Sequence, residues 1–542
     1  MDPRTFAPIQ SFHPLQTPGN RGFRGIRACL ALAASLLGAP AAPAQTVVTT
    51  GDDLAAVVAA AAHGDEIVIQ SDATFVGTLS WTSKHLILRA GVGYHPTLRG
   101  SPDQPALRLT PSPGFGSSVW LRGLRLEPGV VPPGGSARPA VLHTGTAPTQ
   151  PYHSSNTDFE DCLVLGDVEA ACTGGAVNWI NLKRTRVVGA VEVSGTGSAY
   201  TYLGAADGAD IDELRLENNG QATNNCFIEE LRIRGELRIR PLSSGEHDVF
   251  INRSRLEGPV VLQGGSSTGI SVFMESCLLR GTGTGTGLFA RSIDVLEADN
   301  LTITDYAVGL DAELPASFAN LLIFDVADCL APVVLPAQIR RSLIEDGTYQ
   351  GLLGNLGGKP WIDANLALLP GSKGIDHGDN SVISQGNEDL FGDPRYQDND
   401  GDGVVRINCG AIESLGTCAQ AEVTPYNGSG SNPQFLAALT KPKLGQPFVA
   451  SIAYGPQTAA TLLALGVPSP SPLTLAGVEG EILLDLSLFP TLYFASGTHV
   501  IPVPNSFQYC GVELAVQGLR IDLPGGIPLA RCGNGLRLVL GQ

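Results

Sequence analysis

The sequence is poor in charged and aromatic residues. Only 16% of its 542 residues are Asp, Glu, Lys or Arg, and only 6% are Phe, Trp or Tyr. Acidic residues (52) outnumber basic ones (34), and the resulting net charge of -18 argues against nucleic acid as a partner. Beyond the first 44 residues, no apolar run reaches transmembrane length. The absence of any Cys-x-x-Cys pair or cysteine–histidine cluster argues against a zinc site.

Glycine and proline, by contrast, are plentiful, with 66 and 38 residues that follow no short period. This abundance predicts many turns and excludes both a helical bundle and a collagen helix. The hydrophobic fraction of 43% suffices for a folded core, so the composition does not indicate disorder. The length exceeds that of one ordinary domain, and we therefore expect more than one.

The first residues have the pattern of an export signal. Three arginines between positions 21 and 27 precede an apolar run over residues 29–42, which is too short to span a bilayer. Small residues at 42–44 match the preference of a signal peptidase. The pattern predicts a signal peptide over residues 1–44 and a protein secreted to the outside of a bacterial cell or to its envelope.

Nine cysteines remain after this cleavage. Export makes disulfides possible, and the odd number leaves at least one thiol unpaired unless another chain contributes. The predicted pairs are Cys409–Cys418 and Cys510–Cys532, because each lies within one short segment. For Cys162 and Cys277 we expect buried, unpaired thiols.

The middle of the chain repeats a short apolar pattern that ends in glycine. The five segments end at Gly166, Gly189, Gly235, Gly258 and Gly281. Successive glycines are 23, 46, 23 and 23 residues apart, so one unit between the second and the third is degenerate. Apolar residues stand two positions before each glycine and, in the first four segments, two positions after it. Those before are Val164, Val187, Ile233, Leu256 and Leu279, and those after are Val168, Val191, Leu237 and Val260.

This repeat combines a period of two with a longer period of 23 residues, which indicates short strands joined by bends. A unit of that length cannot close a core alone, but stacked units can. The pattern therefore predicts an all-β solenoid, a right-handed parallel β-helix. The signature of leucine-rich repeats is absent, and propeller blades need about twice the period.

The same alternation assigns residues to the outer surface. The outward positions near the glycines hold five arginines: Arg184, Arg186, Arg232, Arg253 and Arg255. On an acidic protein these arginines predict a groove for a carboxylated or sulfated polysaccharide or cell-surface glycan, because guanidinium groups pair with such anions. The alternative is a solvated face whose charge is offset by Glu192, Glu230, Glu236 and Glu257. The sequence leaves both open.

Two segments beside the repeat carry a family resemblance. Residues 54–62 have the composition of a short helix, and a strand pattern follows at 66–69. Downstream, Gly-Ser-Lys-Gly-Ile-Asp-His-Gly at 371–378 resembles a closing turn of bacterial β-helix proteins, and 393–413 resembles their Asp/Gly-rich ending, with Asn408 in place of the usual Asp. Together these segments resemble the pectate-lyase-like superfamily over roughly residues 46–415. The resemblance implies a helix capping the open end of the solenoid, and it implies no single activity.

Asp398, Asp400 and Asp402 alternate just before Gly403. Three carboxylates beside a flexible glycine suit a hard cation that prefers oxygen ligands, such as Ca²⁺. The EF-hand template does not fit, because Cys409 stands where that template has its bidentate Glu. We expect a structural calcium ion here, and the alternative is a solvated polar turn.

Catalytic residues are harder to identify from the sequence. A lyase needs a base and positive groups that neutralise a uronate, and Lys183, Arg184 and Arg186 are the nearest candidates. Residues 156–158, Asn-Thr-Asp, match the first motif of polygalacturonase-like hydrolases, but the later motifs are missing, so we interpret the match as coincidence.

A His–carboxylate site is a further candidate, although no spacing rule supports it. His143 and His153 lie close in sequence to the acidic residues Asp158, Glu160 and Asp161. Such groups could share a proton in catalysis if the fold brought them together.

The C-terminal residues change in character. A Gly/Ser-rich junction at 427–433 is followed by short apolar runs separated by Pro and Gly, which predicts a small antiparallel β-sandwich over residues 421–542. The runs are at 448–452, 460–465, 482–486, 499–503, 512–516 and 536–540. The segment resembles a C-terminal module of secreted bacterial proteins, and the β-helix would then occupy residues 45–420.

Three functions remain open from the sequence. The first, which we favour because no coherent catalytic set is found, is a secreted β-helix protein that binds carbohydrate or a surface without catalysis. The second is a lyase or hydrolase acting on an acidic polysaccharide. The third is an adhesin in which the solenoid spaces the tail from another surface.

Overall fold

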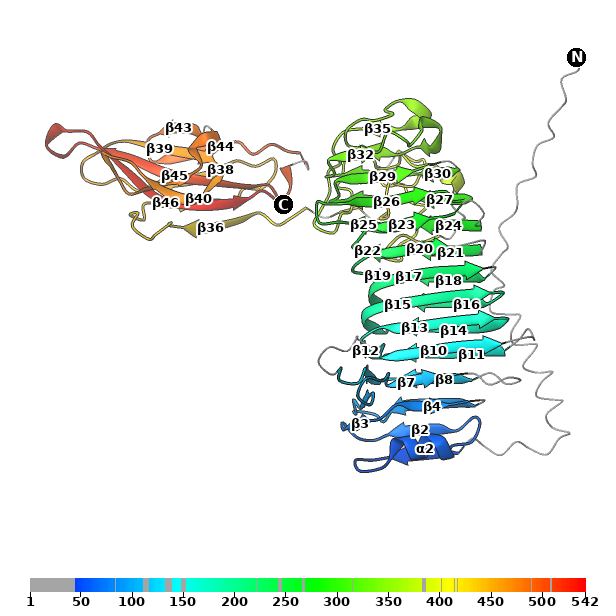
Figure 1. The fold of residues 1–542 in the computed structure, drawn as a ribbon. Coiled ribbons are helices and arrows are strands. Elements are labelled where there is room, and N and C mark those ends of the chain that lie inside the picture. The colour runs from blue at the N-terminus through cyan, green and yellow to red at the C-terminus, as the bar shows by residue number, and fades with distance from the viewer. Residues whose placement is uncertain are drawn as a thin grey trace, which may run out of the picture.

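The computed structural model describes residues 44–542 except 83, 111–116, 132–138, 148–152, 221, 242–245, 266–268, 314, 383–386, 401, 414, 417, 489 and 507–508. The predicted signal peptide therefore lies outside the described residues, apart from its last residue. The described chain forms a long solenoid and a smaller group of antiparallel sheets beside one end of it (Figure 1). Among these residues, no helix combines the length and the apolar character that a membrane crossing needs.

The solenoid is a parallel β-helix, as the repeat predicts. Each coil adds one strand to a 13-stranded parallel sheet, which we name the front sheet. Its strands in order are β1 (Gln45–Val48), β2 (Glu66–Ile69), β5 (His85–Ala90), β8 (Ser118–Arg122), β11 (His153–Glu160), β14 (Ala176–Lys183), β16 (Tyr200–Ala206), β18 (Thr223–Glu229), β21 (Glu246–Asn252), β24 (Gly269–Glu275), β27 (Val295–Asp299), β30 (Ala316–Ala319) and β33 (Ile339–Arg340). The front sheet is thus one complete side of the solenoid.

Two further parallel ladders complete each coil. The corner ladder contains β3 (Thr74–Val76), β6 (Thr97–Arg99), β9 (Arg125–Glu127), β12 (Leu163–Leu165), β19 (Arg232–Ile233), β22 (Arg255–Leu256), β25 (Leu278–Arg280), β28 (Thr302–Thr304), β31 (Leu322–Phe324), β34 (Leu343–Ile344) and β35 (Leu356–Gly357). The back ladder contains β4 (Leu79–Trp81), β7 (Leu107–Leu109), β10 (Val141–Ala147), β13 (Val168–Gly174), β20 (Leu237–Pro241), β23 (Val260–Gln263), β26 (Thr286–Arg291), β29 (Val308–Ala312) and β32 (Asp328–Leu330). The longer strands β15 (Arg186–Gly197) and β17 (Asp210–Gly220) run through both ladders.

The predicted inward columns are confirmed. In the corner ladder, residues paired in register from coil to coil are Val164, Val187, Ile211, Ile233, Leu256 and Leu279, each at most 1% exposed. In the back ladder the same holds for Val168, Val191, Leu214, Leu237 and Val260. The degenerate unit is β17, which keeps both columns by a register shift between Val187 and Ala190. Stacked coils thus bury apolar rows that no single coil could bury.

The repeated glycines allow adjacent coils to approach closely at the bend. Gly189 has φ +147, and a Cβ there would lie 2.7 Å from the backbone carbon of Gly166. A Cβ on Gly258 would lie 2.2 Å from the carbonyl oxygen of Gly235. Since real Cβ contacts are longer than this, only glycine fits without shifting a coil.

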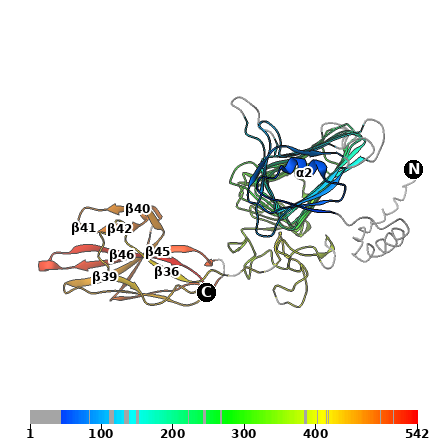
Figure 2. The ribbon, with the colours of Figure 1, turned by 90° about the horizontal axis from the view of Figure 1, so that it is seen from below.

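The predicted cap helix is α2 (Leu54–Ala60), which lies across the open end of the solenoid (Figure 2). The side chain of Asp53 accepts a hydrogen bond from the Ala56 N–H at 3.0 Å and so caps the helix N-terminus. Leu54 and Val58 are buried against the first coils. The helix therefore covers apolar residues that would otherwise face water.

The C-terminal strands form antiparallel sheets at the predicted runs. They are β36 (Glu422–Tyr426), β37 (Leu436–Ala438), β38 (Phe448–Ile452), β39 (Thr458–Gly466), β40 (Pro468–Thr474), β41 (Val478–Glu479), β42 (Glu481–Leu484), β43 (Thr491–Ala495), β44 (Thr498–Ile501), β45 (Glu513–Asp522) and β46 (Leu529–Val539). The sheet β36-β46-β45-β39-β43 packs against the sheet β37-β38-β44 through one apolar core that includes Phe448, Leu463 and Val516. This packing of two sheets is the predicted small sandwich.

The predicted disulfides are wrong. Cys418 is bonded to Cys510, 92 residues away, with the Cα atoms 5.5 Å apart. Cys409 is a buried free thiol against the corner ladder, and Cys532 is a buried free thiol in β46. Proximity in sequence did not decide the pairing, because the antiparallel sheet brings the segment before β36 to the turn before β45. Cys162 and Cys277 are buried and free, as predicted.

Candidate functional site

The turn between the front sheet and the corner ladder forms a column of residues in the left-handed backbone conformation. Residues of this column, all with φ between 46 and 59, are Asp161, Arg184, Asp207, Glu230, Arg253, Ser276, Asn300, Asn320 and Arg341. Such φ values cost energy for residues other than glycine. The first five residues of this column are all charged, three acidic and two basic, and the two basic ones are the predicted binding residues Arg184 and Arg253.

These two arginines are held by carboxylates. Arg184 donates to Asp161 at 2.7 Å and to Glu160 at 2.6 Å, and it lies 3.5 Å from Asp207. Arg253 donates to Glu229 at 2.9 Å and to Glu230 at 2.8 Å, and it also contacts Glu388. Carboxylates of the neighbouring coils thus compensate both guanidinium charges, as the alternative interpretation of the sequence expected.

The other three arginines lie outward on the corner ladder, and Asp210 interrupts their column. Arg186 pairs with Asp210 at 3.0 Å and with Asp212. Arg232 pairs with Glu257 at 2.5 Å.

Arg255 differs from these, because its guanidinium lies 5.1 Å from the centroid of the Phe391 ring. Arg232, Arg253 and Arg255 do line one surface depression together, beside Phe391 and two acidic residues. The structure therefore gathers three of the five predicted arginines without leaving them a free row of positive charge.

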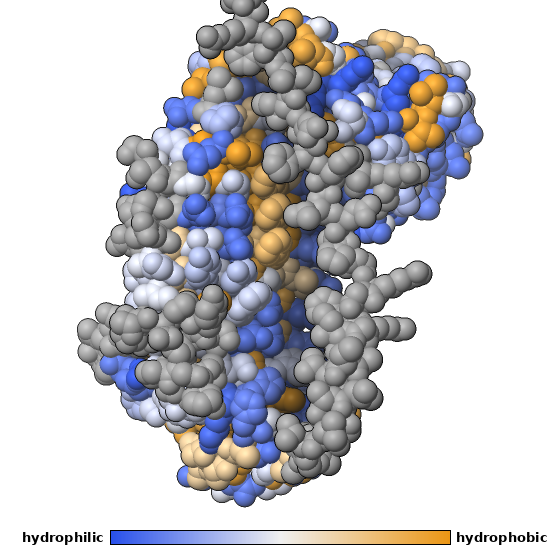
Figure 3. Space-filling model, turned by 90° about the vertical axis from the view of Figure 1, so that its right-hand side faces the viewer, coloured by the Kyte–Doolittle hydropathy of each residue, from blue (hydrophilic) through white to orange (hydrophobic). Residues whose placement is uncertain are grey.

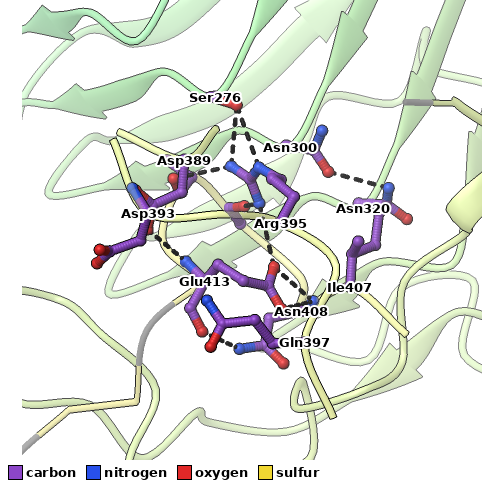
Figure 4. A network of polar contacts seen from close by, with 12 residues as sticks. Ser276, Asn300, Asn320, Asp389, Asp393, Arg395, Gln397, Ile407, Asn408 and Glu413 are labelled. Carbon is purple, nitrogen blue, oxygen red and sulfur yellow. Dashed lines mark hydrogen bonds and ion pairs between the residues drawn. The ribbon is translucent and has the colours of Figure 1, made fainter. Parts of the chain in front are cut away.

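A closing loop, residues 358–413, covers part of the corner ladder. At its centre Arg395 is fully buried and donates to Ser276 Oγ, to the Gly410 carbonyl at 2.9 Å and to the Ala411 carbonyl at 2.8 Å (Figure 4). Its guanidinium lies 3.6 Å from the carboxylate of Glu413, which is also fully buried. The segments that suggested a family ending thus form one buried polar cluster that attaches the loop to the solenoid.

The predicted calcium ligands separate into two groups. Carboxylate oxygens of Asp398 and Asp400 lie within 4.8 Å of each other and of an oxygen of Asp376. Asp402 is not part of this group, since it lies 3.7 Å from Arg406 instead. Burial raises the pKa of Asp376, and the nearby Asp400 charge raises it further. Sequence reasoning missed Asp376 because it belongs to the earlier turn at 371–378, to which the Asp/Gly-rich loop folds back.

The proposed His–carboxylate site does not form at His143. This side chain is fully buried inside the solenoid, beside the Thr157 hydroxyl at 3.3 Å, and desolvation lowers its pKa to about 4. On β11, Thr157 and Phe159 face the core, so Asp158 and Glu160 face the opposite side. The side chain of His153 lies outside the described residues.

The outer face of the front sheet carries aromatic side chains in register, three of them exposed and two partly buried. Phe227, Phe250 and Phe273 occupy one column on β18, β21 and β24, with ring centroids 5.1 and 5.0 Å apart. Trp179 and Tyr202 stack at 3.9 Å in the adjacent column on β14 and β16. The exposed fraction is 52% for Phe227, 38% for Phe250 and 39% for Trp179. We name these five residues the aromatic strip, and apolar surface follows the solenoid axis on this side (Figure 3).

The aromatic strip was visible in the sequence, although only in retrospect. Phe227, Phe250 and Phe273 are each 23 residues apart, the spacing of the glycine repeat. The repeated pattern around the glycines defines the columns of the corner and back ladders and does not reach the front sheet. Extending the same period to the preceding strand would have placed the three rings in one outward column.

Acidic side chains flank the aromatic strip. Glu246 and Asp248 lie on β21 on the same side as Phe250, and Glu297 is the register neighbour of Phe273 on β27. Glu275 and Asp299 are register neighbours in the next column. Burial raises the pKa of Glu275, and burial together with the charges of Glu275 and Glu297 raises the pKa of Asp299 to about 7.

The fold and the surface together define the class of the protein, a parallel β-helix protein whose front sheet presents stacked rings near carboxylates. Comparisons with protein-family models, with curated proteins and with solved structures find no match to this chain. The functional argument therefore depends on the geometry of its own residues.

Proposed function

We propose that this chain is a secreted β-helix protein of the pectate-lyase-like type that binds an extended glycan along the front sheet without cleaving it. The aromatic strip is the observation that carries the proposal. Contiguous exposed apolar surface is uncommon on a soluble protein and marks a binding site. Rings rimmed by polar side chains offer apolar contact and hydrogen bonds together, which is the mixture that a sugar presents.

The repeat of the solenoid supports a polymeric ligand. Phenylalanine recurs in one column over three successive coils, with ring centroids 5.1 and 5.0 Å apart, so one kind of contact is offered three times in a row. A polymer that repeats its own unit can use several such contacts at once, and linked weak contacts add to a high avidity.

The proposal is tested by removing a ring. Phe250→Ala takes away the central phenylalanine, and a matched control is Phe494→Ala, which removes a more exposed ring from β43 in the C-terminal sandwich. We expect Phe250→Ala to weaken retention on immobilised polysaccharides by about tenfold, the size typical of a central aromatic contact. Equal retention of both variants, or retention of neither variant nor the parent chain on any polysaccharide, would contradict the proposal.

Hydrolysis of a glycan is a second candidate, favoured by one observation. Asp299, with a pKa raised to about 7, could donate a proton to a leaving oxygen while an ionised neighbour such as Glu297 activates water. Release of reducing ends from a glycan that Asp299→Asn still binds but no longer cleaves would establish this activity and replace the non-catalytic proposal.

A calcium ion at Asp376, Asp398 and Asp400 is part of the proposal. Three carboxylates so close together repel one another unless a cation lies among them. Calcium at 100 times its dissociation constant would stabilise the fold by about 2.7 kcal/mol. We expect a chelator to lower the melting temperature of the parent chain but not that of Asp376→Asn, and equal responses would argue against the site.

A further inference from the structure

Three acidic residues beside the aromatic strip lack the basic partners that carboxylates along the corner ladder have. Glu246, Asp248 and Glu297 are exposed, and no ion pair or hydrogen bond of their side chains is found among the described residues. From β14 to β27, Lys183 is the basic residue that faces outward on the front sheet, and its Nζ lies 2.9 Å from Asp207. The strip is thus bordered by negative charge that no basic residue of the described part of the chain compensates.

We infer that the ligand of the front sheet is a polysaccharide with free amino groups, an inference that rests on the glycan binding proposed above. A polymer of amino sugars carries a positive charge on many of its rings. Its apolar ring surface can contact Phe227 and Phe250 while an ammonium group reaches Asp248 on the flank. The ring contact recurs over three coils, at Phe227, Phe250 and Phe273. The carboxylates do not repeat in this way, since the register neighbours of Asp248 are Asn225 and Ser271, so an ammonium group is bound at β21 and again at Glu297 on β27.

Charge complementarity selects this ligand over the alternatives. A polyuronate would bring carboxylates next to Glu246, Asp248 and Glu297, and like charges disfavour binding. A neutral glycan could use the rings but would gain nothing from these carboxylates. An ammonium group reduces the repulsion among these carboxylates. The apolar rings exclude part of the water from the site, which lowers the local dielectric constant and strengthens the attraction between ammonium and carboxylate.

The titration of nearby groups points the same way. Glu275 and Asp299 are half-buried in one column beside the strip, and the negative charge of Glu275 and Glu297 contributes to the raised pKa of Asp299. Two arginines act on this pair: Arg340, from β33, on Asp299, and Arg395, from the closing loop, on Glu275. Arg340 is also paired with Asp379, and Asn387 donates a hydrogen bond to Glu275. A bound cation would favour the ionised form of Asp299 and lower its pKa.

The test compares four hexamers that differ in charge. Calorimetric titration of the full chain would use the β-1,4 hexamers of glucosamine, N-acetylglucosamine and glucose, together with a hexamer of galacturonic acid. We expect the glucosamine hexamer to bind most tightly and to weaken as salt is added. Asp248→Asn and Glu297→Gln should each weaken it by about two- to fivefold, the range of an exposed ion pair, and leave the glucose hexamer unchanged.

A matched control is Asp328→Asn, which removes an exposed carboxylate from the back ladder of the same solenoid. It should leave all four affinities as they are. Equal loss in Asp328→Asn and Asp248→Asn would show an effect of net charge alone and overturn the inference.

The remaining outcomes separate the inference from the proposed function. Equal binding of the glucosamine and glucose hexamers, or tighter binding of the galacturonic acid hexamer, would overturn the cationic ligand and leave glycan binding in place. Binding of none of the four would remove both. Concentration-dependent self-association that Phe250→Ala abolishes would show that a second copy of the chain covers the strip, and this too would overturn the inference.

Discussion

The front sheet and the corner ladder are built from the same coils, yet they present opposite kinds of surface. On the corner ladder and its turn, Arg184, Arg186, Arg232 and Arg253 are each paired with carboxylates of neighbouring coils. On the front sheet, Glu246, Asp248 and Glu297 lie beside the rings and have no such partner among the residues that the structure describes. The comparison teaches that exposed charge is available to a ligand only where the stacking of coils has not already paired it.

Coverage distinguishes the two regions as well. The closing loop lies against the corner ladder through Arg395 and Ser276, through the Ala411 N–H and Thr302 Oγ1, and through Phe391 and Arg255. The aromatic strip keeps a large exposed fraction. Changes in the corner region should therefore affect stability, and changes on the strip should affect binding.

The largest effect on stability is expected at Arg395. Arg395→Met would remove the donor of the Gly410 and Ala411 carbonyls and the charge partner of the buried Glu413, whose pKa burial raises to about 8. Removing one member of a buried ion pair typically costs about 3 to 5 kcal/mol, and the loss here should be largest above pH 8, where Glu413 is ionised. Urea unfolding measures this loss, and hydrogen exchange should show that the closing loop is released from the corner ladder. The double variant Arg395→Met, Glu413→Gln should recover part of the loss, because the uncompensated charge is gone. If Arg395→Met were as stable as the parent chain, Arg395 would not be the residue that attaches the closing loop to the corner ladder.

A second effect on stability, which depends on pH, is expected at Asp299. Its native pKa of about 7 lies above the value near 3.8 of an unfolded chain, so the unfolded state loses its proton first as pH rises. This group therefore lowers the stability of the fold progressively between pH 4 and 7, by at most about 1.4 kcal/mol per pH unit.

Unfolding of the parent and of Asp299→Asn at pH 5, 6, 7 and 8 measures this effect. Asp299→Asn should gain in stability relative to the parent as pH increases and should level off above pH 7. A difference between the two that stays constant with pH would mean that Asp299 titrates normally.

The smallest effect is expected at Arg232. Its pair with Glu257 is exposed, so Arg232→Ala should cost less than about 1 kcal/mol in stability. It should also leave the affinity for a bound glycan unchanged, because the front sheet is a separate surface. A large loss of glycan binding in this variant would show that the ligand binds at the arginines of the corner ladder and not on the front sheet.

Much of the fold could be predicted from the sequence, and the reason is periodicity. A 23-residue repeat with alternating apolar residues forces equivalent positions into columns, so Val187, Ile233 and Leu256 had to align. The cap helix, the C-terminal strands and the buried state of Cys162 and Cys277 follow from equally local signals. The column of Phe227, Phe250 and Phe273 was predictable in the same way, because the three residues have the 23-residue spacing of the repeat.

Contacts between segments outside the repeat could not be predicted and required the tertiary structure. The Cys418–Cys510 disulfide, the approach of Asp376 to Asp398, and the burial of Arg395 all depend on where a non-repeating loop folds back.

The tertiary structure also decides which charged side chains on each surface are paired. Alternation shows that a side chain faces outward, but only the stacked coils show which neighbour reaches it. The sequence by itself thus determined the solenoid, because periodic burial has one solution. The tertiary structure decided which exposed groups remain free to bind, because pairing depends on distances between coils and loops.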